Sequence, residues 1–102
     1  YDSWANRIAV HEFVQDIPLS PSHRSHATLM EVENSLAQFC DHRMQLIWGM
    51  KDWCFTPQDF LSEFRRRFPK ADSLELPDAG HYVFEDAFEA VIKQTRSFLS
   101  NS

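Results

Sequence analysis

Two short loops carry the residues that could do acid–base chemistry. The first, GMKD at positions 49–52, ends in Asp52, and the second, DAGH at positions 78–81, ends in His81. A carboxylate beside an imidazole fixes the ring tautomer and stabilises the imidazolium that forms when the histidine takes up a proton. Because histidine titrates near neutral pH, such a pair can serve as a general base. We therefore expect Asp52 and His81 to act together.

Each of these residues also has a non-catalytic interpretation. Asp52 could be a turn or helix-cap aspartate, and His81 an ordinary loop histidine. Asp78 lies three residues before His81 and competes with Asp52 as its partner. We expect Asp78 instead to hold its loop through backbone hydrogen bonds, as aspartate often does in turns.

The spacing of the other histidines and cysteines does not indicate a metal site, and we expect no cofactor. His23 and His26 are three residues apart near a helix start, but no third ligand accompanies them. Cys40 and Cys54 lack the spacing of a zinc or redox site, and we expect both to be reduced thiols of a cytoplasmic protein.

The elements that must position the two loops follow a strand–helix–strand–helix order. Residues 44–48 form an apolar run whose length fits a buried strand, and residues 73–76 alternate as a second strand. Pro57 opens the helix between them, and a last helix spans about residues 85–99. This order predicts an α/β fold with two parallel strands and a right-handed crossover. Ligands bind at the carboxyl ends of such strands, where both loops begin.

The first part of the chain is predicted to be helical. One helix covers residues 2–14, and the prolines at positions 18 and 21 end it. Ser20 or Ser22 then caps a second helix that runs to about Phe39.

Together the two loops resemble the acid and histidine loops of the α/β-hydrolase fold. The sequences of the two loops are most similar to those of the haloalkane-dehalogenase-like branch. The β-lactone decarboxylases of bacterial olefin biosynthesis are near relatives in that branch. Residues 1–4 and 14–19 resemble the return from the cap domain in that branch. The resemblance covers essentially the whole chain. It implies a C-terminal fragment of the fold, with residues 1–40 as the helical return from the cap region and residues 41–102 as the β-α-β-α unit.

The resemblance also implies roles for residues. Asp52 matches the triad acid and His81 the triad base, although some members place the acid on an earlier strand, which would leave Asp52 a loop residue. Substrate-pocket positions follow the two loops: Trp53, Phe55, Tyr82 and Val83. The nucleophile, Asp or Ser, belongs to an upstream elbow, and neither G-x-D-x-G nor G-x-S-x-G occurs here.

Composition excludes several other classes of function. The net charge is −5 at pH 7, and the one basic triplet, residues 65–67, lacks the wider stripe that nucleic-acid binding needs. No apolar run approaches the roughly 20 residues of a membrane helix. We therefore expect neither nucleic acid nor membrane as a partner.

Two functions remain as expectations. The first is the C-terminal segment of a hydrolase that acts on a small-molecule substrate, with the missing N-terminal half as its partner. The chain begins at Tyr1 rather than Met, and two parallel strands alone leave open sheet edges, so we expect a fragment that is inactive in isolation. The alternative is a non-catalytic module whose open edges are covered by a second copy, giving a homo-oligomer.

Overall fold

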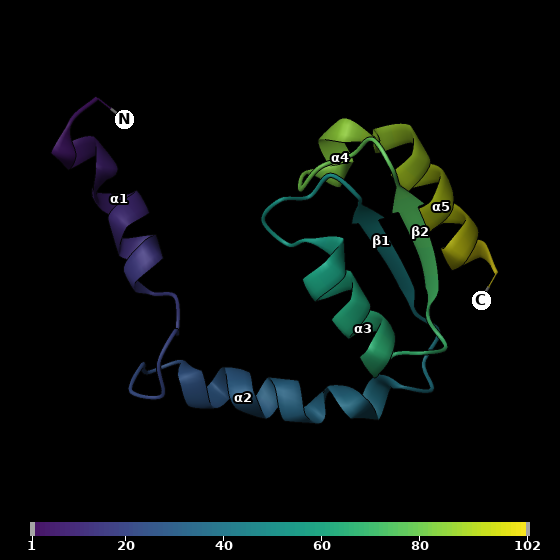
Figure 1. Ribbon diagram of the computed structural model, residues 1–102, viewed down its shortest axis with the longest axis horizontal. Helices are drawn as coiled ribbons and strands as arrows, with labels where there is room; N and C mark the ends of the chain where they lie inside the picture. The colour runs from purple at the N-terminus through teal and green to yellow at the C-terminus, as the bar shows by residue number, and fades with distance from the viewer. Residues whose placement is uncertain (1, 102) are drawn as a thin grey trace. The chain divides into compact units, whose positions relative to one another are not determined.

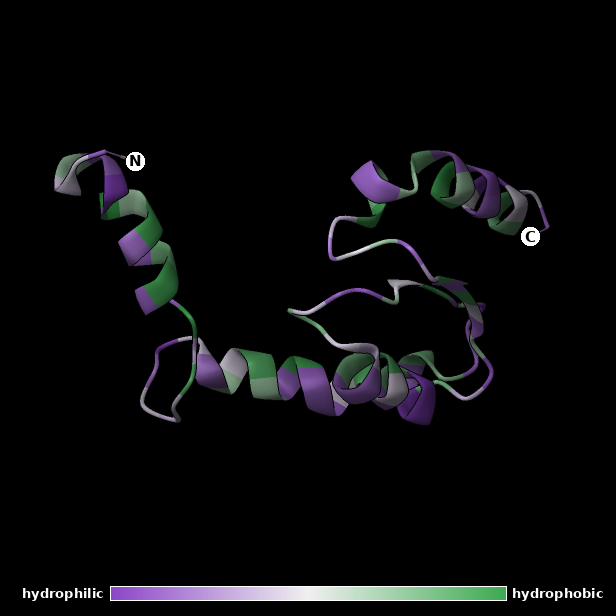
Figure 2. Cartoon of the chain, turned by 45° about the horizontal axis from the view of Figure 1, so that its top comes forward, coloured by the Kyte–Doolittle hydropathy of each residue, from purple (hydrophilic) through white to green (hydrophobic). Residues whose placement is uncertain are grey.

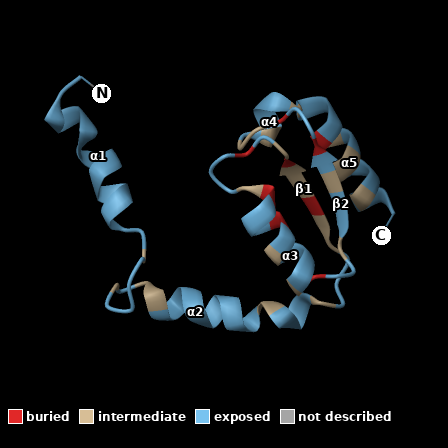
Figure 3. Ribbon diagram, in the orientation of Figure 1, coloured by how far each residue is buried: buried red, intermediate tan, exposed pale blue. Residues whose placement is uncertain are grey.

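The described part of the chain divides into two compact units. The computed structural model describes residues 2–101, and the units meet in sequence between Leu36 and Ala37 (Figure 1). The first unit is helical, and the second contains both strands. All buried positions among the described residues belong to the second unit (Figure 3).

In the first unit, α1 (Trp4–Gln15) occupies most of the helix predicted for residues 2–14, and the Ser3 hydroxyl caps it by accepting a hydrogen bond from the Asn6 amide (3.2 Å). Helix α2 (His26–Ser35) begins later than expected. The predicted caps, Ser20 and Ser22, instead hydrogen-bond each other through their hydroxyls at 2.8 Å. A short 3-10 helix, η1 (Leu36–Phe39), follows α2.

The two predicted strands form a parallel pair in the second unit. Strand β1 (Gln45–Gly49) pairs with β2 (Asp72–Leu76), from Gln45 opposite Asp72 to Gly49 opposite Leu76. The connection between the strands contains η2 (Pro57–Leu61), a π-type turn, and α3 (Ser62–Arg67). Pro57 opens this helical segment as predicted, and the Thr56 side chain caps it by accepting from the Asp59 amide. The predicted α/β class with two parallel strands is confirmed.

Helices lie on both sides of the strand pair. Figures 1 and 2 show α3 on one side and α5 (Phe88–Ser100) on the other. On the α3 side, the ring centroids of Trp48 and Phe64 are 6.0 Å apart. The core on the α5 side gathers these residues: Leu76, Ala79 and Val91, with Ile47, Leu74, Val83 and Ala87 packed against them. Alternate strand residues therefore serve opposite faces.

The predicted last helix is two helices. Helix α4 (Val83–Asp86) ends at Ala87, whose backbone leaves the helical region (φ −143°, ψ 45°), and α5 follows. Among the apolar side chains of this segment, Val91 is 1% exposed, whereas Phe84 and Phe88 are exposed. Within residues 2–101, no helix has the length and apolar character needed to cross a membrane.

Candidate active site

The loops that follow β1 and β2 are joined by backbone hydrogen bonds. The Met50 amide donates to the Leu76 carbonyl, and the Lys51 amide donates to the Ala79 carbonyl, each with an N···O distance of 2.9 Å. Because the strands are parallel and end in register, both loops begin at the carboxyl end of the strand pair. This arrangement holds the acid loop and the histidine loop side by side.

Gly49 permits this close approach. A Cβ atom at this position would lie 2.1 Å from the Gly80 carbonyl oxygen and 2.6 Å from the Ala79 carbonyl oxygen. Neither glycine of the chain has a positive φ, so a left-handed turn is not the reason for glycine here. Glycine is needed at position 49 because the backbone after β2 occupies the space that a side chain would fill.

The structure brings Asp52 and His81 together. His81 Nδ1 lies 3.0 Å from Asp52 Oδ2. The Asp52 side chain is 6% exposed and the His81 side chain 32% exposed, so the carboxylate is enclosed while part of the imidazole faces outward. An enclosed carboxylate behind a more accessible imidazole is the arrangement that orients a general base.

The second carboxylate oxygen of Asp52 fixes the acid loop. Oδ1 accepts hydrogen bonds from the backbone amides of Cys54 (2.9 Å) and Phe55 (2.8 Å). Burial raises the pKa of Asp52, but the hydrogen bonds from His81, Phe55 and Cys54 favour the ionised form and lower the pKa below its usual value. Asp52 is therefore a carboxylate with a fixed orientation at neutral pH.

Trp48 contributes a contact that the sequence did not reveal. Its indole Nε1–H donates to the Phe55 carbonyl oxygen at 2.9 Å, from the end of β1 to the end of the acid loop. The sequence suggests only a core residue, because an apolar strand pattern predicts burial but not the partner of an indole N–H. The signal that could have indicated it is the type of residue, since tryptophan in a core usually needs an acceptor.

A cavity of about 170 Å³ opens beside the pair. Its lining includes Asp52, His81 and two of the expected pocket residues, Phe55 and Val83, together with Ile47, Trp48 and Gly49. The other two expected pocket residues do not line it. Trp53 is 84% exposed and Tyr82 is 69% exposed. The centroid of the Tyr82 ring lies 5.3 Å from the centroid of the His81 ring.

The competing residues have other partners or surroundings. The Asp78 carboxylate is 93% exposed and lies 3.4 Å from Lys51 Nζ, so it does not pair with His81. Cys54 is exposed and carries a free thiol. Over the part of the chain that the structure describes, no group of three or more His, Cys, Asp or Glu side chains could hold a metal ion.

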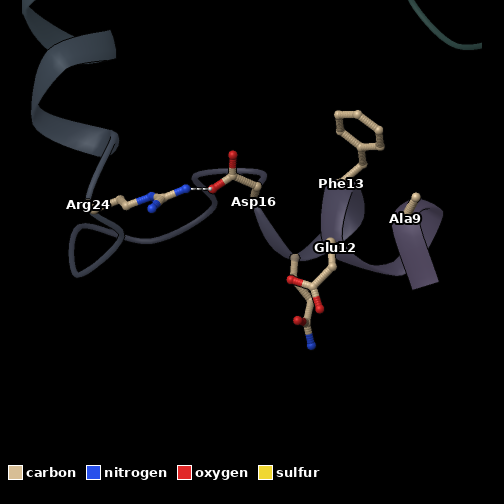
Figure 4. A pocket seen from close by; sticks show the side chains of 6 residues that line it. Ala9, Glu12, Phe13, Asp16 and Arg24 are labelled. Atoms are coloured by element: carbon tan, nitrogen blue, oxygen red, sulfur yellow. Dashed lines mark hydrogen bonds and ion pairs between the residues drawn. The ribbon is translucent and has the colours of Figure 1, made fainter.

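The first unit contains a larger cavity of about 560 Å³, lined by Ala9, Glu12, Phe13, Gln15, Asp16 and Arg24 (Figure 4). Three of its lining side chains are charged, and two of them pair, because Arg24 Nη2 lies 3.0 Å from Asp16 Oδ1. His23 Nε2 lies 3.5 Å from the same Asp16 oxygen, but His23 does not line this cavity, whereas Asp52 and His81 both line the cavity at the ends of the strands.

Comparison with known proteins agrees with the loop motifs. The whole chain is 40% identical to a cis-3-alkyl-4-alkyloxetan-2-one decarboxylase of Xanthomonas campestris pv. campestris and 37% identical to one of Shewanella oneidensis. It spans 34% and 32% of their respective lengths, about a third, in the C-terminal part. A stretch of 42 residues, 41% of the chain, is 45% identical to haloalkane dehalogenase 2 of Mycobacterium bovis and covers 15% of that protein.

No family model matches the chain, and no solved structure gives a significant match. The loops, the parallel strand pair and the relatives nevertheless agree with one another. The chain therefore resembles the C-terminal part of an α/β-hydrolase-fold protein of the haloalkane-dehalogenase-like branch, as its two loops predict.

Proposed function

We propose that this chain supplies the acid and the histidine of an α/β-hydrolase-type active site. The observation that carries the proposal is the 3.0 Å contact between His81 Nδ1 and Asp52 Oδ2. It lies at the carboxyl end of a parallel strand pair, where open α/β sheets bind ligands. The similarity to decarboxylases and a dehalogenase supports it, because those relatives are enzymes.

The ionisation of Asp52 assigns the proton in this contact. A carboxylate can only accept hydrogen bonds, so the hydrogen between the two side chains belongs to His81 Nδ1. In the neutral imidazole, Nε2 then carries the free lone pair and can take up a proton. Asp52 stabilises the resulting imidazolium, and its two amide hydrogen bonds keep it from rotating away.

The nucleophile comes from another part of the protein in this proposal. On a haloalkane, an aspartate nucleophile would form an alkyl ester as the carbon–halogen bond breaks and halide leaves. A water molecule activated by His81 would then hydrolyse the ester to an alcohol and the free aspartate. A serine nucleophile would instead give its proton to His81 directly. Both routes use the same acid and the same base, so the role of Asp52 and His81 is independent of which nucleophile the protein contains.

The relatives suggest the class of small-molecule substrate. An oxetan-2-one is a four-membered cyclic ester, and loss of its carboxyl group as CO₂ breaks one C–C and one C–O bond and leaves an alkene. We propose an alkyl-substituted oxetan-2-one as the substrate, because the similarity to its decarboxylases covers the whole chain. A haloalkane is the second candidate, supported by the shorter match. Apolar cavity residues such as Phe55 and Val83 suit either alkyl group.

The experiment compares variants of the intact protein on both substrate classes. Alkene and CO₂ release from a cis-3,4-dialkyloxetan-2-one would be measured beside halide release from a haloalkane. His81→Gln should lower kcat by about 10²–10⁴-fold, the usual contribution of a general base. The exposed His42, which contacts Phe39, supplies the control variant His42→Gln. Unchanged turnover in His81→Gln would contradict the proposal.

A further inference from the structure

The peptide group that joins Ala79 to Gly80 is held from both sides, directly before His81. Its carbonyl oxygen accepts from the Lys51 amide at 2.9 Å. Its N–H donates to Asp86 Oδ2 at 2.8 Å. The first bond ties the peptide to the acid loop, and the second ties it to the end of α4. The orientation of this peptide sets the direction in which the chain enters His81.

Asp86 is itself fixed by the short helix that follows His81. The amides of Glu85 and Asp86 both donate to the Tyr82 carbonyl oxygen, at 2.9 Å and 3.0 Å. The Asp86 carboxylate then reaches back to the Gly80 amide, six residues earlier in the chain. His81 therefore lies inside a closed turn whose two ends are joined by one side-chain hydrogen bond.

The geometry favours a role at Gly80 over a capping role for Asp86. Helix α5 has no side-chain cap, because its N-cap residue is Ala87. Space around Gly80 is also limited, since a Cβ atom there would lie 3.3 Å from Asp86 Oδ2. An ionised acceptor makes a stronger hydrogen bond to a backbone amide than a neutral one does.

We propose that Asp86 is a positioning residue for His81: by holding the Gly80 amide, its carboxylate keeps the imidazole on Asp52. The proposal rests on the proposed function of the Asp52–His81 pair. Asp86 touches neither the substrate nor the reacting atoms in this account. It acts through the peptide that precedes the histidine, so its loss should change the alignment of the base rather than the binding of the substrate.

The activity test uses the intact protein and an alkyl-substituted oxetan-2-one, with a haloalkane in parallel. Asp86→Ala should lower kcat by about tenfold to a hundredfold, because displacements near 1 Å have effects of this size. KM should change little, since the lost interaction does not bind substrate. Asp86→Asn retains a side-chain oxygen acceptor and should recover most of kcat, and Glu85→Gln is the matched neighbouring control. Wild-type kcat in Asp86→Ala would overturn the proposal.

Two measurements do not depend on activity. In the wild-type protein, hydrogen exchange of the Gly80 amide should be slowed, and an unprotected amide would overturn the proposal even if Asp86→Ala failed to fold. In ¹⁵N-histidine NMR, Asp86→Ala should weaken the hydrogen-bonded Nδ1–H signal of His81. If both readouts respond while His81→Gln keeps full turnover, the proposed function fails and the positioning contact stands. If His81→Gln is inactive and Asp86→Ala leaves all readouts unchanged, the positioning proposal alone fails.

Discussion

Replacing Gly49 with alanine should force the two loops of the site apart. The new Cβ atom would lie 2.1 Å from the Gly80 carbonyl oxygen and 2.6 Å from the Ala79 carbonyl oxygen. Both are backbone atoms, so no side chain can rotate away to relieve the contact. A carbon and an oxygen atom normally approach to roughly 3.3 Å or more, which requires the loops to separate by about 1 Å.

The loss of stability can be calculated from the contacts that this separation of the loops weakens. Loosening the Lys51–Ala79 hydrogen bond costs about 1 kcal/mol, and forcing an extra carbon into a packed site adds roughly 1–3 kcal/mol. Gly49→Ala should therefore lower the free energy of unfolding by about 2–4 kcal/mol. Because His81 belongs to the displaced loop, a 1 Å shift should also lower kcat by about 10²-fold.

Urea unfolding and steady-state turnover of the intact protein measure both effects. Gly80→Ala is the matched comparison, because its Cβ atom would lie 3.3 Å from Asp86 Oδ2, a side-chain atom at a longer distance than the backbone atoms around position 49. Its loss of stability should be the smaller of the two, below about 1 kcal/mol. A Gly49→Ala protein with wild-type stability and wild-type turnover would refute the reasoning.

Three further predictions concern the acid loop and the isolated chain. Folding lowers the pKa of Asp52 from 3.8, so the ionised carboxylate stabilises the native state fully above about pH 4. This stabilisation is lost as the pH falls through the lowered pKa of the native state. Asp52→Asn should therefore show a smaller loss of unfolding free energy on acidification than the wild type. Trp48→Phe removes the donor to the Phe55 carbonyl and should cost about 1 kcal/mol in urea unfolding, whereas an unchanged midpoint would count against this contact. The chain of 102 residues alone should release neither alkene nor halide. Light scattering should detect self-association of this chain through its exposed apolar side chains. A stable, active monomer would contradict both expectations.

Local patterns in the sequence predicted the parts that place the site. The apolar run before Gly49 and the alternating residues before Leu76 indicated two strands, and both are present as a parallel pair. The positions of Asp52 and His81 directly after those strands then predicted their proximity, because parallel strands end at a common edge. The structure agrees, with the two side chains in hydrogen-bond contact.

The contacts that hold the site were not predictable in the same way. The hydrogen bonds of Trp48 to Phe55 and of Asp86 to Gly80 depend on where the loops lie in space, which spacing alone does not specify. The steric need for Gly49 likewise arises from a backbone segment about thirty residues away in the chain. The break at Ala87 also escaped prediction, because alanine is a strong helix former and the apolar pattern continues across it.

A double-mutant cycle tests the central claim most directly. It measures kcat/KM of the intact protein for wild type, Asp52→Asn, His81→Gln and the double variant, on whichever of the two substrate classes the protein turns over. If Asp52 acts by orienting His81, the double variant should be no worse than His81→Gln alone, because residues that act as a unit are strongly non-additive. Losses that simply multiply, or an Asp52→Asn variant with full activity, would contradict the account.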